Sequence, residues 1–398
     1  MRVLSEMKFL GFVLCMPAII ALCACSSEQT ETIANASEED EEYAEVEAVD
    51  ASGGAMTRAL NMTLSSFSLS VMNTKSEILL ADKLRYEKVN GSFSPIGGTW
   101  RMLSSEMMAI GVSPSMDILD NVTMTKAAQT FDYTVPTTEQ TMLKIGSNMS
   151  FTKASTKNKL SMNFVNALSQ FTIKARNELK VEVDNKEYDV KIYVKGVTLH
   201  NFAAKGRFTF TGNYQGTWTP IDNVYANYSQ NLPSPVPLNS TSFVNVMDSI
   251  FVFLPQSPEN NAWTPSGSAT PSASDAISVA DANHKAYIEL RCAMTIERDG
   301  QTVYVWGSSD TYKSVYFPYV KKYCPKVWNV INRQAVYNLR IIKTETLDSD
   351  GAPIKPEELQ NENGQFENAV FLEVAPTDDY GNDNVDDWPD ADINDIVI

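Results

Sequence analysis

Short runs in which apolar and polar residues alternate recur along most of the chain. Leu160, Met162 and Phe164 alternate with polar neighbours, and the residues from Phe171 to Ala175 repeat the pattern. Successive side chains of a strand point to opposite faces, so a period of two indicates half-buried strands. Comparable runs predict strands at 60–71, 84–89, 100–103, 107–112, 129–135, 181–183, 190–197, 208–214, 251–256, 286–297, 301–306, 315–320, 335–342 and 366–374. Long helical periodicity is absent, and the pattern predicts an all-β protein.

Turn residues separate these runs and indicate how the strands are joined. Asn90-Gly91 and Asp299-Gly300 each lie between two predicted strands, where such pairs form tight hairpins. Two intervals rich in Pro, Ser and Asn, residues 227–242 and 258–274, are predicted as surface loops, because a buried loop leaves backbone groups unpaired. Two successive sets of strands of similar size suggest two β-sandwiches in tandem.

The first 24 residues have the composition of an export signal. Two basic residues precede an apolar run from Phe9 to Leu22, which is short for a membrane-spanning helix but suits a secretory signal. The run ends in Leu22-Cys23-Ala24-Cys25, which resembles the bacterial lipobox. We expect residues 1–24 to be removed and Cys25 to be acylated, because two or three acyl chains hold a protein on a membrane. An ordinary signal cut at the same place, with Cys25 unmodified, is the alternative.

An acidic segment follows, and it is predicted to be a disordered tether over residues 25–58. Large apolar residues are scarce in it and acidic residues are concentrated between positions 38 and 50, so it buries little surface and its like charges extend it. Arg58 is the single basic residue between Lys8 and Lys75, and its neighbours are small. A trypsin-like protease would find one obvious bond there, between Arg58 and Ala59. A lone Arg in a solvated linker is the alternative.

The charge and the scarcity of reactive side chains narrow the classes of function. The chain carries 49 acidic and 32 basic residues, a formal net charge of −17 at pH 7, which disfavours nucleic acid as a partner. Its two histidines, His200 and His284, are accompanied by no Gly-rich phosphate loop or nucleophile elbow, so we expect neither an enzyme nor a bound cofactor. The aspartates near position 350 and in the C-terminal stretch lack the spacing of a calcium loop.

Two of the five cysteines remain as candidates for a disulfide. Cys15 and Cys23 leave with the signal and Cys25 is the acylation site, which leaves Cys292 and Cys324. These two residues can pair in an oxidising compartment, and two buried free thiols fit equally well.

Several motifs, in their order along the chain, resemble those of the fimbrillin family. Asn163-Phe164-Val165-Asn166-Ala167-Leu168-Ser169-Gln170-Phe171 is similar to a family signature in which a His-Ala-Leu-Ser-like turn joins two strands, although the family often has His where this chain has Asn166. Phe253-Leu254-Pro255-Gln256, the stretch 328–339 and Val385-Asp386-Asp387-Trp388 are similar in the same way. With the lipobox and Thr57-Arg58-Ala59, these motifs cover the mature chain nearly from end to end.

The resemblance implies a structural subunit, stalk or tip, of a type V fimbria that serves adhesion. Family members have two transthyretin-like Greek-key β-sandwiches, which are expected here at residues 59–204 and 205–398. They travel to the outer membrane as lipoproteins and are cut after an Arg by a secreted protease, and the cut leaves an apolar groove. Another fimbrial subunit fills the groove with a strand from its C-terminal region. The chain would then lie in the fimbrium at the cell surface, where its ligand is unknown.

The C-terminal residues contain the candidate donor strand. Ile396-Val397-Ile398 follow a strongly acidic stretch, in which such an apolar cluster is unusual. Together with Ile393, these residues are predicted either to close the chain's own C-terminal sandwich or to form the strand donated to the next subunit. We favour donation, because the acidic residues from Asp378 to Asp395 let the segment detach and extend.

A surface glycan-binding lipoprotein that does not polymerise is the main alternative. Trp218, Trp263 and Trp306 would then provide exposed faces on which sugar rings stack.

The lipobox generates a first prediction. Cys25→Ser removes the sulfur that carries the diacylglycerol, so the variant should be recovered in the soluble periplasmic fraction while the parent is recovered in the membrane fraction. Cell fractionation with immunoblotting measures the ratio. Recovery of the variant in the membrane fraction at the parental yield would contradict the assignment.

Overall fold

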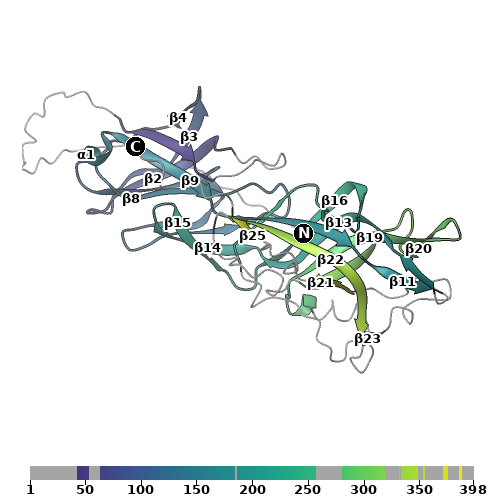
Figure 1. Ribbon diagram of the computed structural model, residues 1–398. Helices are drawn as coiled ribbons and strands as arrows, with labels where there is room; N and C mark the ends of the chain where they lie inside the picture. Colours follow the sequence, from purple (N-terminus) through teal and green to yellow (C-terminus); the bar gives the residue numbers. More distant parts are fainter. Residues whose placement is uncertain are drawn as a thin grey trace, which may run out of the picture. The chain divides into compact units, whose positions relative to one another are not determined.

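The computed structural model describes residues 43–52, 63–183, 186–256, 280–318, 331, 333–347, 353–354, 371–374 and 385–387. Most of these residues form strands; the helical exceptions are α1 (Lys153–Thr156), a turn of 3-10 helix, η1 (Met116–Ile118), and residues 280–282. The strands gather into sheets in sandwich-like arrangements (Figure 1). The prediction of an all-β protein is confirmed. No helix in the described part of the chain is long and apolar enough to cross a membrane.

Two of the sheets lie in the N-terminal part of the chain. A seven-stranded sheet has the order β1 (Glu45–Asp50), β9 (Lys159–Asn166), β8 (Lys144–Phe151), β5 (Met107–Ser113), β2 (Ser66–Asn73), β3 (Leu79–Val89) and β4 (Ser92–Ile96). A four-stranded sheet has the order β15 (Gln215–Pro220), β14 (Lys205–Gly212), β7 (Gln129–Thr134) and β6 (Asp120–Met124). Both ends of the longer sheet, β1 and β4, are edge strands.

The largest sheet gathers strands from the rest of the chain. Its main path is β16 (Tyr225–Pro237), β13 (Lys191–Ala203), β19 (Tyr287–Arg298), β21 (Lys313–Pro318), β24 (Phe371–Val374), β22 (Arg333–Leu347), β10 (Ser169–Asn177) and β17 (Val244–Asn245). Beside this path, β18 (Phe251–Phe253) pairs with β10, β20 (Gln301–Trp306) with β19, and β23 (Pro353–Ile354) and β25 (Val385–Asp387) with β22. A separate hairpin joins β11 (Lys180–Val183) and β12 (Lys186–Asp189).

The seven-stranded sheet is buried on both faces, which explains the long apolar runs of its central strands. Along β5, Met107 and Ala109 point into one apolar cluster, while Ile110 and Val112 point into another. The first cluster, which we call the edge core, lies on the face of the sheet toward which the inward side chains of β1 point. It is filled by aromatic rings, and the Phe67 and Tyr86 rings are stacked with their centroids 5.0 Å apart. The second cluster continues into the four-stranded and largest sheets.

The fimbrillin-like motif around Ala167 is the point at which the chain passes between two sheets. β9 ends at Asn166 and β10 begins at Ser169, and the two strands belong to different sheets. Ala167 and Leu168 are fully buried at this crossing. The backbone N–H of Ala167 donates to the Leu143 carbonyl at 2.8 Å, and its carbonyl accepts from Nε1 of Trp218 at 2.7 Å. Buried hydrogen bonds therefore hold this crossing to the residue before β8 and to β15 of the four-stranded sheet.

The predicted boundary between residues 204 and 205 does not separate the sheets. β10 and β13 precede it but belong to the largest sheet, whereas β14 and β15 follow it and pair with β7 in the four-stranded sheet. Residues 42–398 group as one unit. The chain thus crosses between the sheets several times, which the order of strands in the sequence does not reveal.

Both predicted hairpins are confirmed, and one predicted loop is wrong. Asn90-Gly91 and Asp299-Gly300 have positive φ angles, as tight turns between strands require. Most of the interval 227–242 belongs to β16 rather than to a loop. Among the described strands β16 pairs only with β13, and an edge strand tolerates proline because one side of it needs no N–H donors. Two of its three prolines, Pro233 and Pro235, fall where its register with β13 shifts, between Asn231 and Val236, and Pro237 pairs with Tyr193.

Two further predictions need correction. Residues 100–103 are predicted as a strand but have no regular structure, although Trp100 is buried. The predicted tether, residues 25–58, contains strand β1 at Glu45–Asp50. The acidic composition concealed an alternation in which Val46 and Ala48 point inward while Glu45 and Glu47 point to solvent. Residues 258–274 and 60–62 lie outside the described residues.

A glycine in the seven-stranded sheet and a control glycine outside it test how tightly that sheet is packed. A Cβ on Gly146 would lie 2.9 Å from the Asn163 carbonyl oxygen and 3.2 Å from the Phe164 ring, whereas one on Gly212 would meet its nearest neighbour at 3.6 Å. Gly146→Ala should therefore lower the free energy of unfolding by about 2 kcal/mol, as overpacking does, and Gly212→Ala should change it by less than about 0.5 kcal/mol. Urea denaturation measures both values. Equal effects would contradict the close packing of Phe164.

Candidate functional site at the edge of the seven-stranded sheet

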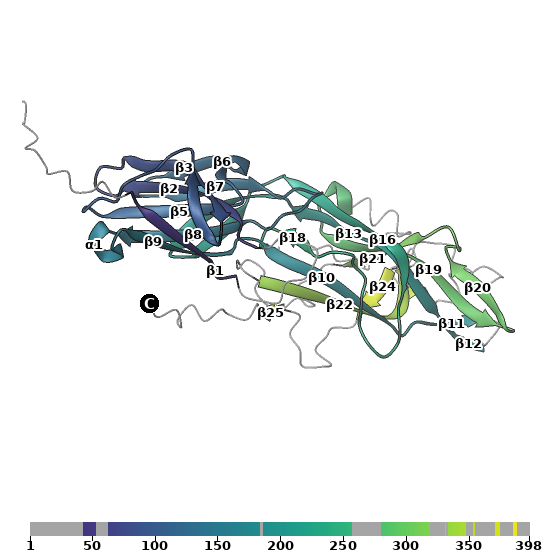
Figure 2. The same cartoon turned by 90° about the horizontal axis from the view of Figure 1, so that it is seen from above.

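Strand β1 covers the outer edge of β9. The two strands are parallel and pair from Glu45 with Lys159 to Asp50 with Phe164. Just beyond the ends of β1, the Glu45 N–H donates to the Asn158 carbonyl at 3.1 Å and the Ala51 N–H donates to the Phe164 carbonyl at 2.8 Å. Figure 2 shows β1 beside β9 at the margin of the sheet. β1 thus supplies hydrogen-bonding partners that the edge of β9 otherwise lacks.

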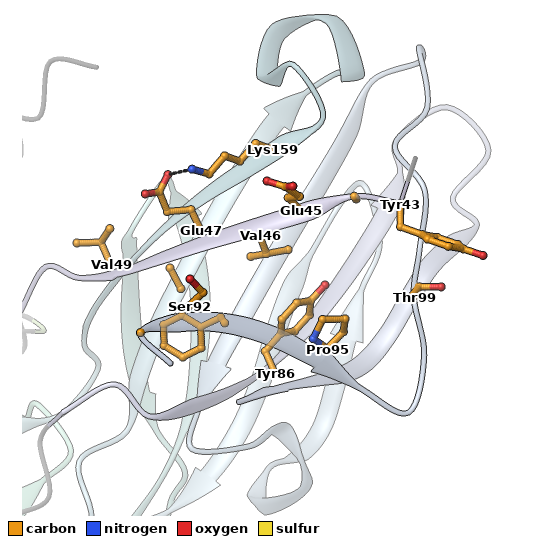
Figure 3. A pocket seen from close by; sticks show the side chains of 14 residues that line it. Tyr43, Glu45, Val46, Glu47, Val49, Tyr86, Ser92, Pro95, Thr99 and Lys159 are labelled. Atoms are coloured by element: carbon orange, nitrogen blue, oxygen red, sulfur yellow. Dashed lines mark ion pairs between the residues drawn. The ribbon is translucent and has the colours of Figure 1, made fainter. Parts of the chain in front are cut away.

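The inward side chains of β1 are small. Val46 is 8% exposed and belongs to the edge core, and Ala44 and Ala48 pack against it. Figure 3 shows Val46 pointing from β1 toward Tyr86, on the face opposite Glu45 and Glu47. Burial raises the pKa of Tyr86 to about 12, in spite of a hydrogen bond from Trp100 Nε1 to its hydroxyl at 3.1 Å. The wall that receives β1 is therefore a closely packed apolar and aromatic surface.

A cavity of about 540 Å³ lies beside β1. It is lined on one side by β1 and on the other by the β3–β4 hairpin, including Tyr86, Phe93 and Pro95 (Figure 3). The two edge strands of the same sheet thus approach each other across this space. Because the side chains of β1 are short, they leave volume that larger apolar side chains would fill.

A buried lysine holds the C-terminal end of β1. Nζ of Lys144 donates to both carboxylate oxygens of Asp50, at 2.8 and 2.9 Å, and to Oγ of Ser52 at 2.7 Å. The Lys144 side chain is 3% exposed and that of Asp50 is 26% exposed. Burial lowers the pKa of Lys144, and the Asp50 carboxylate opposes this shift. An ammonium in such a place needs its carboxylate, because an unpaired buried charge is strongly destabilising.

A second ion pair lies on the outer face of β1. Oε2 of Glu47 is 2.9 Å from Nζ of Lys159, and both side chains are about half exposed (Figure 3). An exposed pair of this kind contributes little to stability. Both pairs nevertheless fix the position of β1 along the sheet, because each holds an acidic residue of β1 against a lysine of the sheet.

Sequence reasoning missed this site. Val46, Asp50 and Lys144 were not among the candidate residues, because the segment was interpreted as a tether and the strand containing Lys144 has no clear alternation. The signal that could have found β1 is the sequence Glu45-Val46-Glu47-Ala48, in which charged and apolar residues alternate.

Most of the residues that the sequence singled out lie outside the described part of the chain. This holds for Cys25, for Arg58 and Ala59, for Cys324, and for Ile393, Ile396, Val397 and Ile398. Cys292 is described: it is fully buried in the core, and burial raises the pKa of its thiol. Whether Cys292 pairs with Cys324 stays a prediction. No cluster of metal-ligating side chains occurs among the residues that the structure describes.

The histidines and tryptophans that the sequence raised as candidates are engaged in packing. Nε2 of His200 is 2.6 Å from a carboxylate oxygen of Glu289, and the ring of His284 is stacked on Tyr225. Trp218 is 6% exposed and Trp306 is 4% exposed, so the expectation that these two rings are exposed is wrong. Trp263 lies outside the described residues.

The Lys144 pair generates a stability prediction. Asp50→Asn leaves the Lys144 ammonium buried without a charged partner, so the free energy of unfolding of the uncut protein should fall by about 2 kcal/mol, less than for a fully buried pair because Asp50 is partly exposed. Lys144→Met should cost less, because it removes the buried charge. Glu47→Gln at the exposed pair is the matched control, with an expected loss under about 1 kcal/mol. Urea denaturation of the three variants measures these losses in the free energy of unfolding. An Asp50→Asn loss no larger than that of Glu47→Gln would refute the role of Asp50 as the partner of the buried Lys144.

Comparison with known proteins shows which solved structures have a similar fold. No protein-family model matches the chain, and no curated protein matches it by sequence. Among solved structures, a fimbrial protein from Bacteroides vulgatus aligns with a TM-score of 0.51 and 14% identity over 87% of this chain and 99% of that one. The fimbrial anchor protein Mfa2 from Porphyromonas gingivalis aligns with a TM-score of 0.27 and 10% identity over 50% of this chain and 74% of its own, which is too low to carry an argument. The chain therefore has the fold of a bacterial fimbrial protein, in agreement with the fimbrillin resemblance of its sequence.

Proposed function

We propose that the chain is a fimbrial subunit that serves adhesion at the cell surface. In this proposal it is exported as an outer-membrane lipoprotein through Cys25, is cut between Arg58 and Ala59 by a trypsin-like protease, and polymerises by donor-strand exchange. The likeness to a fimbrial protein over nearly its whole length supports the first part. The placement of β1 at an edge of the seven-stranded sheet supports the exchange, and it is the observation on which the proposal rests.

The order of residues along the chain makes β1 removable. β1 ends at Asp50, which precedes Arg58 in the sequence. A cut after Arg58 would therefore separate β1 and the lipid anchor from the rest of the chain in one step. After that cut β1 would be held non-covalently, chiefly by its ladder with β9, its inward side chains and its two ion pairs.

Loss of β1 would leave a site suited to another strand. The exposed edge of β9 would offer a row of unpaired N–H and C=O groups, and the edge core would be open on that side. An extended segment can add to such an edge through main-chain hydrogen bonds, with side-chain pockets providing specificity. Left empty, the same edge is an aggregation hazard, and regular polymerisation removes that hazard.

A donor strand with larger apolar residues would bind more tightly than β1. Each additional buried methylene contributes about 0.8 kcal/mol, and an Ile in place of Ala48 adds three carbons. The cavity beside β1 has room for them. The predicted donor residues Ile393, Ile396, Val397 and Ile398 are all larger than alanine. Exchange is then favourable even though β1 occupies the site first.

The glycan-binding alternative has less support. Two of the three tryptophans that it needs, Trp218 and Trp306, are buried and offer no face to a sugar ring. We therefore do not pursue it as a second function.

Limited proteolysis tests the proposal. Brief trypsin treatment of the Cys25→Ser protein should cut first between Arg58 and Ala59 and should then produce fibres in electron micrographs and a ladder on gels run without boiling. Arg58→Gln is the matched control and should stay monomeric. N-terminal sequencing that finds Arg58 intact after a different first cut would contradict the processing step, and an absence of fibres after the correct cut would contradict exchange.

Deletion of residues 393–398 tests whether the donor strand lies in this segment, because the deletion leaves the acceptor edge unchanged. The deletion variant should fold, melt close to the parent temperature and still be cut after Arg58, but it should remain monomeric. A melting temperature far below that of the parent would show that the segment belongs to the chain's own sandwich. Fibres from this variant would show that the donor strand lies elsewhere.

A further inference from the structure

The buried ammonium of Lys144 sets a chemical requirement on any strand that replaces β1. Its hydrogen bonds to Asp50 and Ser52 all go to one short segment that precedes Arg58. Its side chain is 3% exposed, so little water is available to solvate it. A strand that filled the edge without a carboxylate at this position would leave the charge buried and unpaired. The incoming strand must therefore carry an acidic residue at the place of Asp50.

The C-terminal segment of the chain repeats the charge pattern of β1. β1 and the next residue read Glu45-Val46-Glu47-Ala48-Val49-Asp50-Ala51, and the C-terminal segment reads Asp390-Ala391-Asp392-Ile393-Asn394-Asp395-Ile396. Both have acidic residues at the first, third and sixth positions and apolar residues at the second, fourth and seventh. In β1 the acids at the third and sixth positions are the two that pair with lysines of the sheet.

We infer that residues 390–396 of a second copy of this chain replace β1 in the same register, with Asp395 at Lys144 and Asp392 at Lys159. This inference rests on the proposed function and names the segment and the contacts that it uses. Ala391 and Ile393 then occupy the positions of Val46 and Ala48 that face the edge core. Ile396 occupies the position of Ala51, which is 5% exposed and belongs to the second cluster, on the other face of the sheet. The longer Ile393 extends toward the cavity between β1 and the β3–β4 hairpin.

Neighbouring registers fail to place acidic residues at the two lysines and apolar residues at the inward positions. A shift of one residue turns Asp390 and Asp392 toward the edge core and takes Asp395 off the face on which Asp50 meets Lys144, since successive side chains face opposite sides. A shift of two in one direction puts Asp395 at the inward position of Ala48 and Val397 beside Lys144. A shift of two in the other direction puts Pro389 at the position of Val46 and Ile393 beside Lys144. The lysines therefore select one register.

A second copy is the occupant, because before the cut each chain fills its own edge with β1. The tail follows β25, whose last residue, Asp387, pairs with Arg333 on β22. A tail that returned to its own edge after the cut would give a closed monomer, and the test below distinguishes that outcome.

A double-mutant cycle on trypsin-cut Cys25→Ser protein tests the register. Asp395→Asn should slow polymer formation, followed by light scattering and electron microscopy, at least tenfold. Asp383→Asn removes the same charge from the same acidic stretch outside the matched segment and should stay within twofold of the parent. In the Lys144→Met background, the effect of Asp395→Asn should shrink to less than twofold, because the ammonium that needs Asp395 is gone.

A disulfide experiment gives a readout that does not depend on the stability of Lys144→Met. Glu47 pairs with Ser161 on β9, so Ser161→Cys in one copy and Asp392→Cys in another should form an intermolecular disulfide under mild oxidation after the cut. Ile393→Cys in place of Asp392→Cys is the control, because in the proposed register that side chain faces the core and should not cross-link.

The possible results separate this inference from the function on which it rests. A parent that forms no polymer after the cut, including one that closes on itself as a monomer, overturns both. A parent that forms polymer equally well with Asp395→Asn and with Asp383→Asn overturns the register alone. An Asp395→Asn effect of the same size in both Lys144 backgrounds, or equal cross-linking by Asp392→Cys and Ile393→Cys, also overturns it.

Discussion

The outer edge of β9 has to be covered, and much of the N-terminal structure depends on that constraint. β9 carries Leu160, Met162 and Phe164, which are fully buried in the edge core, and it continues through Ala167 into β10 of the largest sheet. An unpaired edge beside these residues would expose backbone groups and aromatic surface together. β1 covers the edge with six paired residues. The strand therefore stabilises the sheet although it lies at its margin.

In the proposed exchange β1 would cover this edge only until the cut, and its composition fits that role. Its inward side chains are Ala44, Val46 and Ala48, so it buries less apolar surface than a strand of large residues would. It is held instead by two ion pairs, one at its C-terminal end and an exposed one near its middle. Both features lower the barrier to replacing it while the ladder with β9 keeps the uncut chain folded. A strand of large apolar residues at the same place would stabilise the subunit more and would be harder to exchange.

The sequence predicted strands whose apolar residues are evident and failed where composition conceals the pattern. Alternation and tight-turn pairs predicted β7, β9 and β20 closely and the second half of β3, because half-buried strands have a period of two. β8 was missed, since its residues Lys144 to Phe151 are mostly polar or small although they lie in the middle of the sheet. β1 was missed because its acidic residues suggested a solvated segment. Sheet membership could not be predicted at all, because strand pairing between distant residues leaves no local signal.

The same limit applies to the candidate site. Arg58 and Cys25 could be proposed from local motifs, but the partnership of Lys144 with Asp50 joins residues 94 positions apart. A buried ion pair is weak as a source of stability, since removing two charges from water offsets most of their attraction. The pair can instead discriminate between incoming strands, because a strand without a carboxylate in the right place leaves a charge unpaired. An apolar groove alone would accept many strands in many registers. In the proposed exchange, the buried lysine would make the groove selective for sequences that carry an acidic residue where β1 carries Asp50.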